Sequence, residues 1–248
     1  MKKRFQNKIA SSQIALPLMA ICALAVCYFW DMLNADGYVQ VGCLAFSTYV
    51  MAEMNNRNAL LRIPSRMVSC SFLVLSMLTC ESLKDLNTSL VQMLFILSLA
   101  ILFTAYQDRK AHGKLFCAFC CIGLASVFWL HILLLVPVLW FCAAAFLLEL
   151  SWKNFFASVL GLLLPYWLLA GWFSLHANLD WFAVHFSGFS QWTMPELAWN
   201  GTWVELTVVL FIILLLLTGT IHFLRRSYLD KLRTRFLYEM FIVTGMAL

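Results

Sequence analysis

Charged residues are scarce in this chain: they make up 12% of its 248 residues, while hydrophobic residues make up 63%. A water-soluble domain of this length needs a more highly charged surface. The chain also lacks the strict apolar–polar alternation of a membrane β-barrel, since runs such as residues 206–217 are continuously apolar. Backbone N–H and C=O groups in hydrocarbon must form hydrogen bonds within the protein, so membrane-spanning helices are the structure that is left. We therefore predict an all-α, polytopic transmembrane helix bundle.

Motifs that carry chemistry are also missing. No apolar segment has a central Asp, Glu, Lys or Arg, the usual mark of an ion-coupled carrier. There is no Walker loop, no His-Glu-x-x-His motif and no nucleophile elbow. The nine cysteines lie in or at the ends of apolar segments, where they act as small hydrophobes. We predict no cofactor and no metal, and we leave the question of an enzyme open, leaning against it.

Apolar segments long enough for helices that cross about 30 Å of hydrocarbon follow one another along the whole chain. We treat residues 1–248 as a single transmembrane domain with eight spans. They are expected at residues 14–30, 38–54, 64–80, 88–106, 115–129, 131–148, 154–172 and 204–224. The apolar segment 236–248 is either part of a ninth span or an interfacial helix.

The distribution of positive charge decides the topology. Residues 115–148 form one apolar run, which as a single helix would extend about 50 Å and is too long for one crossing. Dividing it by a tight turn near His131 leaves Lys84 as the only one of the 17 Lys and Arg residues on the outer side. Cytoplasmic loops retain Lys and Arg. The N-terminus is therefore expected in the cytoplasm.

The longest outer loop, residues 173–203, is rich in aromatic and titratable side chains. Its aromatic outer surface comprises Trp181, Phe186, Trp192, Trp199 and Trp203. An aromatic belt at the membrane interface explains these residues, and a platform for a lipid-linked sugar is the alternative. Weak catalytic candidates in the same loop are His176, Asp180 and His185. His176 and Asp180 are four residues apart, as in an acid–base pair or a structural pair. Helical spacing further predicts a short amphipathic helix here, lying on the membrane.

An inner loop offers a second candidate site. Arg57, Arg62 and Arg66 lie in a loop that is also rich in Asn. Guanidinium groups grip phosphate oxygens in pairs, so this loop predicts anion binding. A phospholipid headgroup is the expected ligand, and a phosphorylated substrate or a partner protein is the alternative. The net charge of +5 does not indicate nucleic acid, because the basic residues flank apolar segments.

Four short features carry a resemblance to a known family: residues 62–66 (Arg-Ile-Pro-Ser-Arg), the expected helix end at Tyr106-Gln107, and residues 160–166 and 230–235. They resemble a family of multi-pass inner-membrane proteins from Gram-negative anaerobes of the gut and mouth. That family has no assigned reaction, so the resemblance implies no residue roles. Its members are often longer, with further apolar segments after the last basic loop, which implies that this chain is a truncated version.

These observations favour an accessory or assembly component of envelope biogenesis in the bacterial inner membrane. The alternatives are an enzyme or carrier that acts on lipid-linked sugars at the outer face, and a small-molecule transporter. Membrane lipids are the expected partners, together with other membrane proteins or further copies of the chain. No nucleic-acid partner is expected.

Overall fold

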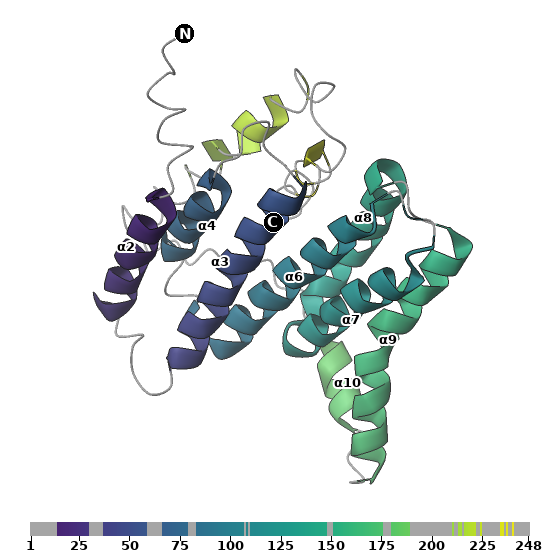
Figure 1. The fold of residues 1–248 in the computed structure, drawn as a ribbon. Coiled ribbons are helices and arrows are strands. Elements are labelled where there is room, and N and C mark those ends of the chain that lie inside the picture. The colour runs from purple at the N-terminus through teal and green to yellow at the C-terminus, as the bar shows by residue number, and fades with distance from the viewer. Residues whose placement is uncertain are drawn as a thin grey trace.

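The computed structural model describes residues 14–29, 37–58, 66–78, 83–106, 108, 110–147, 151–175 and 180–188, with scattered positions between 210 and 240. These parts of the chain are helical and contain no strand (Figure 1). The predicted all-α class is therefore confirmed for them. Of the expected segment 204–224 the structure describes residues 210, 213, 214, 216–221 and 224, and of 236–248 only residues 237 and 240.

Three helices form an N-terminal group: α2 (Ala15–Phe29), α3 (Tyr38–Asn58) and α4 (Met67–Leu78). Both α2 and α3 pack against α4, which lies between them (Figure 1). Their shared core is small and apolar, and it includes Ala23, Cys27, Leu44 and Leu73. The group joins the rest of the protein through α3, which packs against α6 (Leu86–Thr104).

The larger core lies between α6, α7 (His112–Phe128) and α9 (Trp152–Leu175). Leu102, Phe103, Leu115 and Phe119 are almost completely buried there. The start of α6 is capped by Asp85, whose carboxylate accepts from the Thr88 backbone N–H at 3.1 Å and its hydroxyl at 2.9 Å. These two bonds hold the pKa of Asp85 below its ordinary value.

The long apolar run breaks where α7 ends. Trp129 is extended (φ −143°, ψ 101°), and a 3₁₀ helix, η1 (Leu130–Leu134), follows it. The chain then returns through α8 (Leu135–Cys142) and a π-helical turn, η2 (Ala143–Leu147). The Phe119 and Trp140 rings stack at 6.0 Å across this reversal. The break thus lies two residues before His131, where a turn is expected from the charges.

Two glycines, one on α7 and one on α9, each lie against the backbone of the facing helix. A Cβ atom on Gly161 would lie 2.3 Å from the Phe116 carbonyl oxygen, and one on Gly123 would lie 2.5 Å from the Leu162 carbonyl oxygen. The ring of Pro165 fills the space beside Gly123. Small residues let helix backbones approach in this way, which maximises van der Waals contact where water supplies no driving force.

Two of the described helices, α6 and α9, are long and apolar enough to cross a membrane. Helices α2, α4 and α7 are apolar but shorter, and α3 ends in the polar segment 53–58. The lengths of the described helices therefore do not support eight spans of the predicted kind. The sequence is apolar across these segments, but the helices there, including the helical run Leu130–Ala145, are shorter than the roughly 20 residues that a crossing needs.

Gly161→Ala is expected to destabilise the protein by about 1–3 kcal/mol, because the added methyl group overlaps the Phe116 carbonyl. The measurement is unfolding by SDS titration in mixed micelles. Gly171→Ala is the matched control on the same helix, since its methyl group would meet nothing within 4 Å. Equal stability of the two variants would contradict the close packing of α7 against α9.

Candidate functional site

Polar and aromatic side chains from three helices meet where α7 ends. We call Ser126 of α7, Tyr166 of α9 and Trp181, His185 and Phe186 of α10 (Asp180–Ser187) the Tyr166 cluster. The chain turns back after α9, so that α10 lies alongside the end of α9 (Figure 1). The Phe186 ring lies 5.6 Å from the Tyr166 ring and thereby docks α10 near the middle of α9.

Hydrogen-bond geometry fixes the direction of the donors in this cluster. The Ser126 hydroxyl lies 2.7 Å from the Gly123 carbonyl oxygen and 2.8 Å from the Tyr166 hydroxyl. A serine hydroxyl has one hydrogen, which goes to the carbonyl because a carbonyl can only accept. Tyr166 therefore donates to Ser126. The chain of donors runs from Tyr166 through Ser126 into the backbone of α7.

His185 is held mainly by its ring faces. Its imidazole stacks on the Trp181 indole at 4.6 Å with an interplanar angle of 10°, and it lies 6.2 Å from the Tyr166 ring. Its Nε2 atom is shielded from solvent and has no hydrogen-bond partner among the described residues. Burial lowers the pKa of His185, and the neighbouring backbone of Ser126 opposes this shift in part.

This geometry suits helix docking better than nucleophilic catalysis. A serine nucleophile needs its proton directed at a base such as histidine. The Ser126 proton is instead directed at the Gly123 carbonyl. Trp181 also stacks on Phe173 of α9 at 5.1 Å, so that the ring contacts extend to the end of that helix. The Tyr166 cluster thus holds α10 against α7 and α9.

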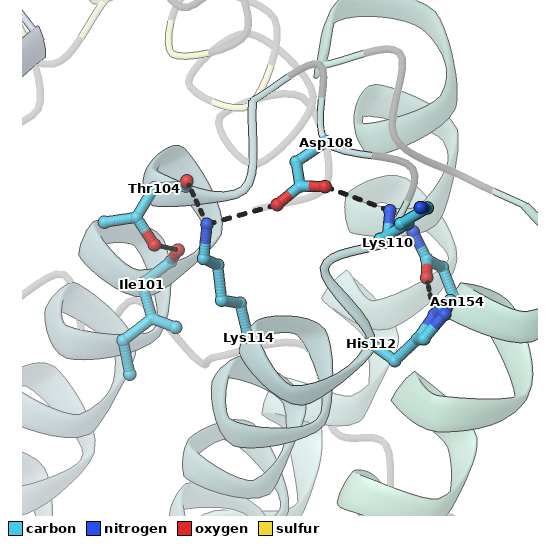
Figure 2. A network of polar contacts seen from close by, with 7 residues as sticks. All are labelled: Ile101, Thr104, Asp108, Lys110, His112, Lys114 and Asn154. Atoms are coloured by element: carbon cyan, nitrogen blue, oxygen red, sulfur yellow. Dashed lines mark hydrogen bonds and ion pairs between the residues drawn. The ribbon is translucent and has the colours of Figure 1, made fainter.

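A second polar network lies at the opposite end of the same helices (Figure 2). The Lys114 ammonium group donates to the Thr104 carbonyl at the end of α6 (3.0 Å) and lies 3.4 Å from the Asp108 carboxylate. The Lys110 backbone N–H donates to the Asp108 carboxylate at 3.0 Å. This bond and the Lys114 ammonium group together lower the pKa of the Asp108 carboxyl group. His112 bonds to the fully buried Asn154 side chain of α9. These bonds join the ends of α6, α7 and α9.

The structure describes some of the predicted site residues and not others. Arg57 pairs with Glu53 one turn earlier on α3, and Arg66 directly precedes α4. Trp181, His185 and Phe186 lie together in the Tyr166 cluster, and only the backbone of Asp180 is described. The predicted residues outside the described parts are Arg62, His176, Trp192, Trp199 and Trp203. The described residues include no group of three or more His, Cys, Asp or Glu that could hold a metal.

Sequence reasoning missed Ser126, Tyr166, His112 and Asn154. Each is a single polar residue within or beside an apolar segment, and its partner lies about 40 positions away. One signal was available: a polar group in hydrocarbon must find a partner. Ser126 and Tyr166 could have been flagged as a pair in that way, but their register could not.

Acidification is expected to loosen α10. Docking of α10 favours the neutral form of His185, because the pKa of the docked imidazole is lowered. The docked state is therefore most stable above the ordinary imidazole pKa of about 6.5, and it loses this stability as the pH falls through the lowered pKa of His185. Hydrogen exchange of residues 181–187, corrected for its intrinsic pH dependence, measures this. His185→Phe keeps an aromatic ring and is expected to abolish the effect. Equal acid loosening in that variant would assign it to another group.

Comparison with family models, with curated proteins and with solved structures found no match for this chain. The geometry of its own residues is therefore the basis for a functional proposal. That geometry comprises a closely packed pair of helices, a docked aromatic helix at one end and a basic polar network at the other.

Proposed function

We propose that this chain is a multi-pass protein of the bacterial inner membrane that acts there as a non-enzymatic accessory or assembly component of envelope biogenesis. Its partners are membrane lipids and other membrane-protein chains, including copies of itself. The membrane location is supported by the surface of α9 and by the placement of charges. The non-enzymatic role is supported by the use of polar side chains in the Tyr166 cluster.

The surface of α9 has the pattern of a helix in contact with lipid. Trp152 and Trp172 are 79% and 61% exposed, and they stand 20 residues apart, which corresponds to about 30 Å along a helix. That distance matches the hydrocarbon thickness, with a tryptophan at each interface. Leu160 and Leu168 between them are also exposed. Only 22% of the apolar window of α9 is buried, whereas the core helix of a soluble protein is mostly buried.

The described helices also segregate positive charge. Gln40 at the start of α3 bonds to the Lys84 carbonyl just before α6 begins, so these two helices run in parallel. Arg57 at the end of α3 then shares an end with the network of Lys110 and Lys114 beside the end of α6. Lys153 at the start of α9 lies at that end too, beside Asn154. The positive-inside rule assigns that end to the cytoplasm.

The hydrogen-bond direction in the Tyr166 cluster is the observation that carries the non-enzymatic role. Ser126 donates to the Gly123 carbonyl oxygen and Tyr166 donates to Ser126, so that neither hydroxyl proton is directed at a substrate or base. The Nε2 atom of His185, which has no hydrogen-bond partner among the described residues, favours the second candidate, an enzyme or carrier for lipid-linked sugars at the outer face, because such an atom can accept or donate a proton.

Reporter fusions test the proposed topology. Fusions after Lys114 and after Lys153 are both expected to report the cytoplasm, and a fusion after Lys84 is expected to report the opposite compartment. The reason is that the positive-inside rule acts on the Lys and Arg residues of short loops. Opposite compartments for Lys114 and Lys153 would refute the reversal after Trp129 as a membrane hairpin.

Gene deletion followed by profiling of envelope lipids and glycans tests the proposed role. We expect His185→Phe to restore a normal profile to the deletion strain at neutral pH, because the ring contacts with Trp181 persist. A titratable imidazole used in catalysis contributes about 10²–10⁴-fold. Failure of His185→Phe with build-up of a lipid-linked intermediate, despite normal folding, would favour the enzyme.

A further inference from the structure

An apolar groove of about 310 Å³ lies between α2 and α3 and is open along one side. Leu73 of α4 contributes to its floor. Small side chains leave the space, chiefly Ala20 and Ala23 of α2 and Ala45 and Ala52 of α3. In contrast to α7 and α9, α2 and α3 make few contacts with each other, because α2 packs against α4 and α3 packs against α6 and α4.

The groove offers an incoming molecule only apolar contacts. Thr48 lines it, but its hydroxyl donates to the Leu44 carbonyl oxygen of its own helix at 2.8 Å. The remaining lining side chains are aliphatic apart from Cys27 and Tyr49, and the Tyr49 side chain stands exposed. A polar ligand would leave its donors and acceptors unpaired here, at a cost that a hydrocarbon chain avoids.

The length of the groove matches one leaflet of a bilayer. Its lining on α3 runs from Val41 to Ala52, which is about 16 Å at the helical rise. Half of a hydrocarbon core of about 30 Å is about 15 Å. One acyl chain that enters from a single leaflet therefore fits the groove lengthwise.

Positive charge marks one end of the groove. Gln92 of α6 donates to Ser76 at 3.3 Å, which places the end of α4 near the start of α6 and the beginning of α4 at the opposite end, beside the end of α3. Arg66 directly precedes α4 and stands seven residues before Leu73, at the end of α4 that lies beside the end of α3. Its guanidinium group can pair with a phosphate.

Arg57 has a different position. It follows Ala52 by five residues, which turns it about 140° away around α3, and its guanidinium group pairs with Glu53. Asn56, four residues after Ala52, stays on the groove side of α3 and is exposed. Asn56 and Arg66 thus both lie toward the same end of the groove, whereas Arg57 faces elsewhere.

We propose that the groove between α2 and α3 holds one acyl chain of an anionic phospholipid, whose headgroup phosphate contacts Arg66 and Asn56. The proposal rests on the membrane insertion proposed above. The lipid belongs to the leaflet on the side of Lys110 and Lys114, because Arg66 lies at that end of the helices. The bound acyl chain would fill the space between α2 and α3 and so complete the apolar packing of the N-terminal group of helices.

Photolabelling tests the groove. The full chain is placed in bilayers of phosphatidylcholine that contain phosphatidylglycerol with a diazirine in its acyl chain, and the labelled peptides are identified by mass spectrometry. We expect labels on the groove faces of α2 and α3. Ala45→Leu fills the groove and is expected to lower this labelling about tenfold. Ala25→Leu adds the same atoms to an exposed position of α2 outside the groove and is expected to leave it unchanged.

The headgroup contact has its own matched pair of variants. Arg66→Gln is expected to remove the preference of the groove for phosphatidylglycerol over an equally labelled phosphatidylcholine. Arg57→Gln is expected to keep that preference, because Arg57 lies off the groove side. Equal loss in both variants would overturn the assigned headgroup site and indicate only a general attraction of the basic end for anionic lipid.

Labelling of the exposed face of α9 is the internal reference. Labels on α9 with equal groove labelling in Ala45→Leu and Ala25→Leu would overturn the bound acyl chain and leave membrane insertion intact. Cross-links that show the groove filled by another segment of this chain or by a partner protein would overturn it as well. Absence of lipid labels from α9 and the groove alike would overturn membrane insertion together with this proposal.

Discussion

The contact between α7 and α9 is the constraint on which the rest of the structure depends. Gly123 and Gly161 bring the two backbones so close that a methyl group at either position would meet a carbonyl oxygen. That approach sets Ser126 within 2.8 Å of Tyr166, and Tyr166 in turn provides the ring against which Phe186 docks α10. At the other end it sets His112 against Asn154. A wider separation would break both polar contacts and release α10.

Small residues serve two opposite purposes in this chain. Between α7 and α9 they let the two helices come into direct contact. Backbone atoms of the facing helix lie against both glycines, and the ring of Pro165 lies against Gly123. Between α2 and α3 the alanines leave space, because α4 holds the two helices at its own sides. The first arrangement gives a rigid pair that needs no ligand. The second gives a groove whose apolar walls favour hydrocarbon.

Periodicity, apolar length and charge predicted much of the fold but little of the site. The spans expected at 88–106 and 154–172 correspond to α6 and α9, whose ends differ by a few residues. The span expected at 38–54 lies within α3, which is helical but is not among the helices apolar enough to cross a membrane. Charge distribution also indicated a turn near His131, and the helix breaks at Trp129. Contacts between distant residues could not be predicted, because the position of Gly123 relative to Leu162 cannot be read from a single sequence. Of the predicted arginine group, Arg57 pairs with Glu53 on α3 and Arg66 directly precedes α4.

Solid-state NMR of the chain in lipid bilayers tests the central contact most directly. With carbon-13 in glycine and phenylalanine, the Gly161 Cα is expected to show a short-mixing cross-peak to the Phe116 carbonyl carbon, since a Cβ atom on Gly161 would lie 3.0 Å from that carbon. A parallel sample with labelled leucine is expected to show the Gly123 Cα cross-peak to the Leu162 carbonyl. Absence of both cross-peaks in a folded, bilayer-embedded sample would contradict the close approach of α7 and α9 and the arrangement of the Tyr166 cluster derived from it.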